Sequence, residues 1–462
     1  MAEIEKEYQI YKAWISTERE LTTSMDAGGQ VPIDFDIKNN IIELNLYESV
    51  EKPYLTGDIL LNDDMGLRQT IQINGTERLL IEVGVPGSGV TPFFKRFIIT
   101  GVSADTKIGN ATDVYLFHFV EEHAYFSALK RLSVKYEGTP AQIISSVFTT
   151  ELNKQVVTGL VQAVNEPMRV LTPYLTPLET VEWVRDRMVS VIGSPYICYS
   201  TLRDNSIHLD EFAILIDTPA WNESTPYVYG ANLANTATSG ASLQREIQRQ
   251  YFSISSMQNR VNENQLNVAQ GGGLGSIFEV LDPLTGDVYS SFHNGHTTIS
   301  DIISSSFNNT EDQLVLDNKL SFTAMSHGQL TIDNFPTRVF TQISSSAVYD
   351  DINGYHDEST DSSKHLLKIK AAAIRTVFAY NMTQITVPGN PYIVNNKAGV
   401  GTTIEVEVPI ASHRPELVGY LDPNRSGKYG IYNIRHNFKD ERHTAFIDIV
   451  KLTRRKRALT AQ

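Results

Sequence analysis

The chain has 462 residues, with 53 acidic against 39 basic side chains and a formal net charge of −14. This balance argues against a protein that coats nucleic acid, and the length is too great for one hydrophobic core. The single cysteine, Cys198, excludes an intramolecular disulfide. The acidic N-terminus lacks the apolar segment of a signal peptide, and no apolar run approaches the ~20 residues of a membrane helix. We therefore expect a protein made in a cytoplasm, without membrane insertion.

Residues 31–122 have the pattern of a β-barrel. Ile42, Leu44 and Leu46 alternate with polar residues, so each strand buries only one side. Turn residues separate seven strand-like runs, which are 31–37, 41–47, 55–61, 69–73, 79–85, 93–102 and 114–120. The sequence therefore predicts a first tube-like barrel over residues 1–120.

The next segment, residues 121–220, has helix signals. Thr139 precedes a proline and is a candidate N-cap residue. Thr176 also precedes a proline and forms a capping box with Glu179. A strand pair is expected within 196–212. This segment is predicted to be an α+β insertion with a hairpin.

Residues 221–362 are rich in Ser, Asn, Thr and Gly, which predicts a loop-rich connection with some strands that join a second barrel. A long helix is expected over 363–378, because apolar residues recur there at helical spacing. Ile404 and Val406 then alternate with polar residues, as in the first barrel. Residues 363–462 should hold this helix, a second tube-like barrel and a basic tail. The predicted fold class is mainly β with an α+β insertion and two antiparallel β-barrel domains.

Two histidine pairs are candidate metal ligands. His118 and His123 flank two glutamates, but they are five residues apart across a strand-to-helix boundary. A zinc protease motif needs a spacing of four on one helix. His293 and His296, with Asp301, could bind a metal on a helix or on a trimer axis, but the Asn-Gly between them favours a turn. No metal ligand is assigned.

The other chemical signals favour structure over catalysis. The glycine run 271–275 lacks the Lys-Ser/Thr of a phosphate-binding loop and predicts a flexible or tightly bent loop. Cys198 is flanked by aromatic residues rather than by a base, which favours a buried structural thiol. Carboxylates between 350 and 361 lack calcium-loop spacing. No catalytic residue and no cofactor are assigned.

One dense basic run lies on this acidic chain. It comprises Arg454, Arg455, Lys456 and Arg457. One interpretation is a solvated terminus. The other is contact with an acidic partner surface or with DNA phosphate, which makes these four residues the candidate partner contacts.

Six stretches carry a resemblance to a known family. They are PYLTGDILLND at 53–63, LTPLETVEWV at 175–184, GSPYICYST at 193–201, ITVPG at 385–389, SGKYGIY at 426–432 and IRH at 434–436. With these motifs the chain resembles the central baseplate hub protein of contractile-tailed bacteriophages, a family related to the hubs of phage-like injection and secretion machines. The order of parts matches as well: barrel, helical insertion with hairpin, irregular middle, helix, second barrel.

The resemblance implies a homotrimer whose six barrels form a pseudo-sixfold ring around a central channel. That ring would join a threefold central spike to the sixfold tail tube, and DNA would pass through it without specific binding. The implied partners are the spike and a tail-tube-initiating protein, with the tape measure protein and the inner baseplate wedge as further candidates. The implied location is the virion tail baseplate, after assembly in the host cytoplasm, and no enzymatic activity is expected.

Two alternatives stay open. The first is a hub or spike component of a phage-like secretion or injection machine. Such hubs usually continue into a β-prism needle, and the ten residues after Leu452 favour the phage version. The second is a tail component with wall-degrading activity, which would need a hydrolase domain or a β-helical repeat.

Overall fold

The fold is seen in a computed structural model of the chain. It describes residues 7–17, 33–64, 66–67, 73, 75–87, 89–108, 112–158, 168–186, 188, 190, 193–212, 215, 218–230, 251–259, 266, 270, 275–281, 283, 286–294, 335–343, 371, 375, 382–389, 399–410, 420–422 and 425–451.

Seven strands and one short 3-10 turn form the first barrel. They are β1 (Gln9–Thr17), β2 (Ile33–Asp36), η1 (Lys38–Asn40), β3 (Ile41–Ser49), β4 (Thr56–Asp63), β5 (Arg78–Gly84), β6 (Phe93–Ile108) and β7 (Thr112–Glu121). Every second residue of β4 is buried, which is the alternation that a strand with one core face requires. The inward side chains, such as Ile59, Phe97 and Phe119, form one hydrophobic cluster. Strand order in this barrel is β2-β1-β5-β6-β7-β4-β3.

Seven further strands form the second barrel. They are β13 (Tyr227–Tyr229), β14 (Ser253–Ile254), β15 (Ser256–Asn259), β19 (Met382–Pro388), β20 (Thr403–Glu407), β21 (Gly427–Lys439) and β22 (Arg442–Lys451). Their order is β14-β13-β20-β21-β22-β19-β15. Only Ser255 separates β14 from β15, so this bent segment closes the barrel. The barrel has its own core, which includes Ile385, Val406 and Ile447.

The two barrels have the same topology. Counted along the chain within each barrel, the first strands are β1 and β13 and the seventh are β7 and β22. In both barrels the order across the sheet is second, first, fifth, sixth, seventh, fourth, third. One strand differs in direction: β13 is parallel to its neighbours β14 and β20, whereas β1 is antiparallel to β2 and β5. The prediction of two tube-like β-barrels in a mainly β chain is confirmed.

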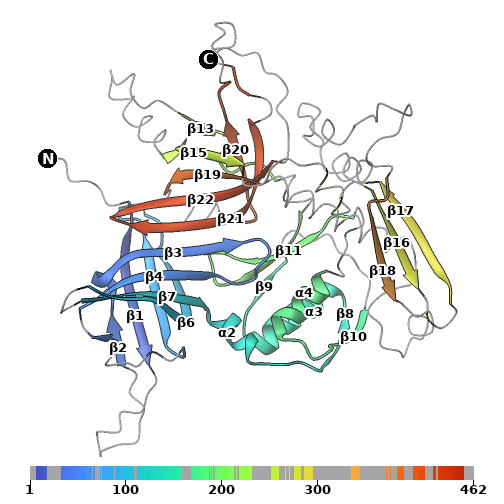
Figure 1. The fold of residues 1–462 in the computed structure, drawn as a ribbon, viewed down its shortest axis with the longest axis horizontal. Coiled ribbons are helices and arrows are strands. Elements are labelled where there is room, and N and C mark those ends of the chain that lie inside the picture. Colours follow the sequence, from blue (N-terminus) through green and yellow to red (C-terminus); the bar gives the residue numbers. More distant parts are fainter. Residues whose placement is uncertain are drawn as a thin grey trace, which may run out of the picture.

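The barrels are joined by strand pairing into one sheet. The first half of β21 pairs with β20, and its second half, from Asn433 to Lys439, pairs with β3 of the first barrel. Figure 1 shows β15, β19, β22, β21, β3, β4 and β7 as successive rows from top to bottom. Because backbone hydrogen bonds cross this joint, the barrels form a rigid tandem.

The α+β unit follows the first barrel. It contains α2 (Glu122–Ala128), β8 (Lys135–Gly138), α3 (Pro140–Leu152), β9 (Val156–Val157), β10 (Met168–Leu171), α4 (Pro177–Arg185), β11 (Tyr196–Ser200) and β12 (Ile207–Glu211). Both predicted N-caps are confirmed: Thr139 and Thr176 each accept a hydrogen bond from the backbone three residues on. Thr139 also has a reciprocal partner, Gln142, which makes a second capping box.

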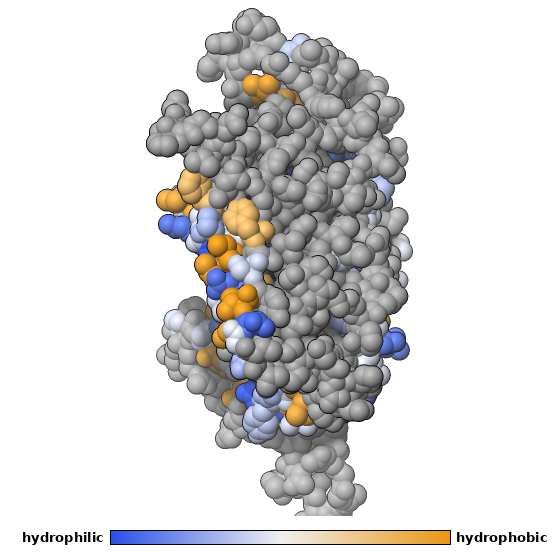
Figure 2. Space-filling model, turned by 90° about the vertical axis from the view of Figure 1, so that its right-hand side faces the viewer, coloured by the Kyte–Doolittle hydropathy of each residue, from blue (hydrophilic) through white to orange (hydrophobic). Residues whose placement is uncertain are grey.

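A separate three-stranded sheet lies between β15 and β19 along the chain. It consists of β16 (Gly275–Leu281), β17 (Val288–Asn294) and β18 (Arg338–Ile343), in the order β17-β16-β18. Phe278 is buried in it, whereas Val288, Phe292 and Val339 are exposed. This sheet lies at the right of Figure 1, the side that faces the viewer in Figure 2, where hydrophobic and hydrophilic residues alternate along a narrow strip.

Some elements were not predicted, and some predictions lie outside the described residues. β1 has no counterpart in the sequence prediction, and it supplies Ala13 and Ile15 to the first core. Of the helix predicted over 363–378, Ala371 and Arg375 are described and both are helical, whereas the acidic loop 350–363 and most of the strand at 69–73 lie outside the described residues. No helix among the described residues is both long and apolar enough to cross a membrane.

Candidate functional site

The sheet that spans the barrels carries a polar surface on the side opposite the cores. We call it the polar face, and it consists of the outward side chains of five adjacent strands. Its members are Asp58 of β4, Glu43, Asn45 and Tyr47 of β3, Asn433, Arg435, Asn437 and Lys439 of β21, Asp448 of β22 and Gln384 of β19. Hydrogen bonds between these side chains join the two barrels.

Asn45 is the centre of the polar face. Its Nδ2 donates to Asp58 at 2.8 Å and to Glu43 at 3.0 Å. Its Oδ1 accepts from Asn437 at 2.8 Å and from Arg435 at 3.1 Å. One side chain therefore links β4, β3 and β21, and so ties the two barrels together on this side.

The cations of the polar face are neutralised locally. Lys439 lies 3.4 Å and Arg435 lies 3.6 Å from the carboxylate of Glu43, which also accepts from Asn437 at 2.7 Å. Partial burial raises the pKa of Glu43, but hydrogen bonds from Asn45 and Lys439 outweigh this and lower it. The face thus presents amides and paired charges rather than unpaired cations that would hold phosphate.

Replacing Glu43 by glutamine should turn the polar face into a weak phosphate-binding surface. Glu43→Gln frees Lys439 and Arg435 from their shared carboxylate, so affinity for a double-stranded oligonucleotide at low salt should rise severalfold and fall again as salt is added. Fluorescence anisotropy measures it. Glu151→Gln, which frees Lys130 on another surface, is the matched control. Equal affinities for the two variants would contradict the neutralising role of Glu43.

A buried polar layer separates the two hydrophobic cores. Nδ1 of His436 lies 3.2 Å from Nε2 of His443, and Nε2 of His436 lies 3.8 Å from Glu48. All three side chains are buried. Burial and the neighbouring His436 lower the pKa of His443 well below its ordinary value, so this ring is neutral at pH 7.

Glu48 also joins three segments that are distant in sequence. Its carboxylate accepts the backbone N–H of Leu202 at 2.7 Å and that of Val400 at 3.3 Å. Leu202 begins the turn of the β11–β12 hairpin, and Val400 precedes β20. A single buried carboxylate thus positions the hairpin against both barrels.

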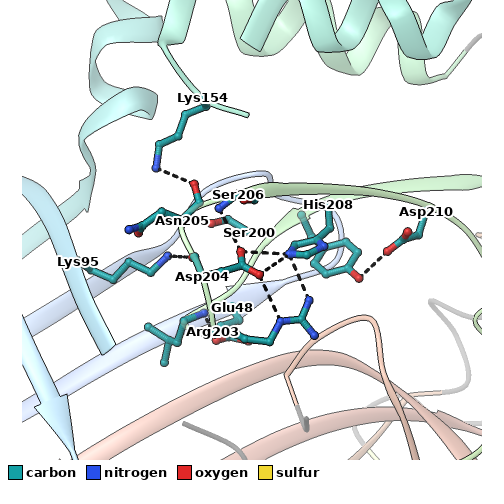
Figure 3. A network of polar contacts seen from close by, with 12 residues as sticks. Glu48, Lys95, Lys154, Ser200, Arg203, Asp204, Asn205, Ser206, His208 and Asp210 are labelled. Carbon is teal, nitrogen blue, oxygen red and sulfur yellow. Dashed lines mark hydrogen bonds and ion pairs between the residues drawn. The ribbon is translucent and has the colours of Figure 1, made fainter. Parts of the chain in front are cut away.

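Figure 3 shows the polar contacts that hold the turn of the β11–β12 hairpin against the first barrel and the α+β unit. Lys95 of β6 donates to the carbonyl of Asp204, and Lys154 donates to the carbonyl of Asn205 at 3.4 Å. The Asp204 carboxylate in turn lies 3.1 Å from His208. Partial burial raises the pKa of Asp204, but the contact with His208, the backbone N–H of Ser206 and the charge of Arg203 lower it to about 2, so this carboxylate is charged at neutral pH.

Glu121 lies at the end of β7, where the first barrel meets the α+β unit. Its carboxylate accepts from Lys154 at 2.8 Å, from the backbone N–H of Leu55 at 3.1 Å and from Ser200 at 3.2 Å. Burial alone raises the pKa of Glu121, but the surrounding His123, Lys95 and Lys154 lower it to about 2. It is thus a buried anion whose partners come from both units.

The histidines weighed as metal ligands have structural roles or lie outside the described side chains. His123 is buried, with Nε2 2.8 Å from the carbonyl of Pro53, whereas His118 is exposed and lies 2.8 Å from Ser103. The side chains of His293, His296 and Asp301 lie outside the described residues. Among the described residues, no three His, Cys, Asp or Glu side chains are grouped so that they could hold a metal ion.

The glycine run, the basic tail and Cys198 are the remaining residues singled out in the sequence. Gly275 begins β16, and the rest of the glycine run lies outside the described residues, as do Arg454, Arg455, Lys456 and Arg457. Cys198 is fully buried in β11. Its burial raises the pKa of the thiol to about 12.

The thiol of Cys198 should therefore be inert in the folded protein. At pH 8 the native chain is expected to take up iodoacetamide at least a hundredfold more slowly than the urea-unfolded chain, because only the thiolate reacts and this one is buried. Intact mass spectrometry over time measures the uptake. Rapid labelling of native protein would contradict a structural thiol.

Comparisons with known proteins add one finding about the fold. No protein-family model matches the chain, and no curated protein is similar to it in sequence. Among solved structures, it is similar to the 43 kDa tail protein of prophage MuSo2 from Shewanella oneidensis, with a TM-score of 0.51 and 10% identity over 95% of this chain and 98% of that one. The fold is that of a phage tail protein.

Two other solved structures are similar to a lesser degree. The tail protein from Neisseria meningitidis MC58 has a TM-score of 0.46 and 10% identity, over 96% of this chain and 97% of that one. The prophage tail protein gp18 from Listeria monocytogenes EGD-e has a TM-score of 0.41 and 8% identity, over 95% and 94%. The expected fold of a phage tail protein is confirmed by the prophage MuSo2 protein.

Proposed function

We propose that the protein is a structural hub of a contractile phage tail, in which three copies form a pseudo-sixfold ring that joins a central spike to the tail tube. The observation that carries the proposal is the pair of barrels with identical strand order in one rigid chain. Three such chains present six similar units, which suits contact with threefold and sixfold partners at once.

The polar face supports a role in lining the channel. Its side chains are bonded to one another, and its cations are paired with Glu43. A surface of this kind offers duplex DNA few counterion-releasing contacts. DNA would then pass the ring without being held, and the chain needs no catalytic residue for this work.

The oligomeric state tests the proposal. Light scattering after gel filtration should give three times the 51.6 kDa chain mass, and class averages from electron microscopy should show a ring with six lobes. Pull-down with the spike and the tube-initiating protein from the same tail tests the partners. A monomer that binds neither protein, or cleavage of peptidoglycan in a turbidity assay, would overturn the hub function.

A further inference from the structure

The two barrels match residue by residue across four strands. β6 and β21 each carry a β-bulge against their hairpin partner, between Ile99 and Gly101 and between Ile431 and Asn433. Aligning the bulges makes Gly101 equivalent to Asn433. Residues that are paired directly on neighbouring strands form a row across the sheet. In the first barrel the row from Gly101 continues through His118, Asp58 and Asn45. In the second barrel the row from Asn433 continues through Asp448, Gln384 and Gln258. Therefore β15 in the second barrel takes the place of β3 in the first.

The inward residues confirm this alignment independently. It makes Ile59 equivalent to Ile385, and both are completely buried in their cores. It also makes Leu44 equivalent to Met257, which packs against the second core. The correspondence therefore covers both faces of the sheet.

The second half of β21 in the second barrel and the second half of β6 in the first barrel differ in their neighbours. Beyond its pairing with β20, β21 continues to Lys439, and this second half is covered by β3. β6 likewise continues to Ile108 beyond its pairing with β5, which ends at Ile98. The Ile99 amide still donates to Glu77, and from Thr100 onward that backbone edge has no strand partner among the described residues.

The complementary edge lies at the opposite end of the same sheet. β15 pairs with β19 on one side, and within the described part of the chain no strand pairs with its other side. In Figure 1, β15 lies at the top of the stacked strands and β6 at the bottom. Among the described strands, the two edges that would make such a joint therefore lie at opposite ends of the sheet, each without a strand on it.

We propose that the free edge of β15 pairs antiparallel with the free half of β6 in a second copy of the chain, reproducing between copies the β3–β21 joint that exists within each copy. Asn45 is directly opposite Asn437 in the internal joint. In the alignment of the barrels, Gln258 is equivalent to Asn45. Thr106 is equivalent to Asn437, because Thr106 pairs with Val114 in the first barrel as Asn437 pairs with Thr444 in the second. Gln258 of one copy should thus lie opposite Thr106 of the next.

The chemistry of the two edges fits this pairing. Gln258 and Thr106 are both exposed, and both lie on the same side of the sheet as the polar face. Open strand edges are normally covered, because their unpaired amides and carbonyls invite association. The joint rests on the proposed trimeric ring: three copies, each contributing β15, β19, β22, β21, β3, β4, β7 and β6, would close one continuous sheet without edges.

Cysteine crosslinking tests the joint. In the double variant Thr106→Cys and Gln258→Cys, mild oxidation or a short bis-maleimide should convert most of the full-length chain into covalent dimers and trimers on a non-reducing gel. Native Cys198 can stay in place because it is buried. The matched control combines Thr106→Cys with Gln384→Cys, which lies on the same face one strand further from the edge and should give at least tenfold less crosslinking.

Different results of this experiment test the β15–β6 pairing and the proposed hub function separately. Light scattering on the same samples reports the oligomer. A trimer in which the edge pair crosslinks no better than the control pair overturns the β15–β6 joint and leaves the hub function intact. A monomer without crosslinks overturns both. Crosslinking of Asn45→Cys with Asn437→Cys, within one chain, verifies that the chemistry reports this register.

Discussion

Replacing Glu121 by glutamine is expected to lower the free energy of unfolding by about 3 kcal/mol, because it removes a buried charge while the cations around it remain. Lys154 would lose its 2.8 Å contact, and the buried ammonium of Lys95 would lose a compensating charge. Urea denaturation followed by fluorescence measures the change. The control is Glu82→Gln, whose pair with Lys12 is partly exposed and should contribute less than about 1 kcal/mol.

The same carboxylate should make stability depend on pH. Its pKa of about 2 in the folded chain lies below the ordinary value of 4.5. Its stabilisation is therefore complete above pH 4.5 and is lost as the pH falls from there toward 2. The difference between the wild-type chain and Glu121→Gln should shrink through this range. A difference that stays constant down to pH 3 would contradict the assigned pKa.

Replacing Phe438 by alanine is expected to cost about 3–5 kcal/mol and to loosen the joint between the barrels. Phe438 belongs to β21 of the second barrel, but its fully buried ring packs in the core of the first. It stacks on His443 with ring centroids 4.4 Å apart and lies 5.1 Å from the ring of Tyr8. Because the ring ties strands β21 and β22 of the second barrel to the core of the first, its loss should also split thermal unfolding into two transitions.

Differential scanning calorimetry measures both effects for Phe438→Ala. Phe94→Ala is the matched control, because this ring is 38% exposed on the outside of β6 and should cost less than about 1 kcal/mol. A single transition, shifted no further than that of the control, would show that the barrels are not coupled through Phe438.

The sequence predicted much of the barrel architecture because strand alternation is a local signal. Runs such as Thr56–Asp63 bury every second residue, as their pattern indicates. β1 was missed because its apolar residues are interrupted by Lys12 and by a bulge near Ile10, so the period is broken where the core contact begins.

The joint residues left a weaker signal that could have been used. Glu48 continues the buried series of Leu44 and Leu46, and Lys95 lies between the inward residues Phe93 and Phe97. A charged side chain on an otherwise apolar strand face indicates a buried polar contact. The sequence does not name its partner, since Leu202 and Val400 are far from Glu48 along the chain.

What the sequence alone determined is the set of local choices: two groups of half-apolar strands, two capped helices, a buried thiol and the absence of a recognisable catalytic motif. The tertiary structure decided how these parts meet. Pairing of β21 with β3 depends on contacts between residues hundreds of positions apart. The bulge alignment of the barrels and the edges of β6 and β15 depend on which strands become neighbours. Strand patterns specify which face is buried, but the choice of neighbour depends on the packing of the whole chain.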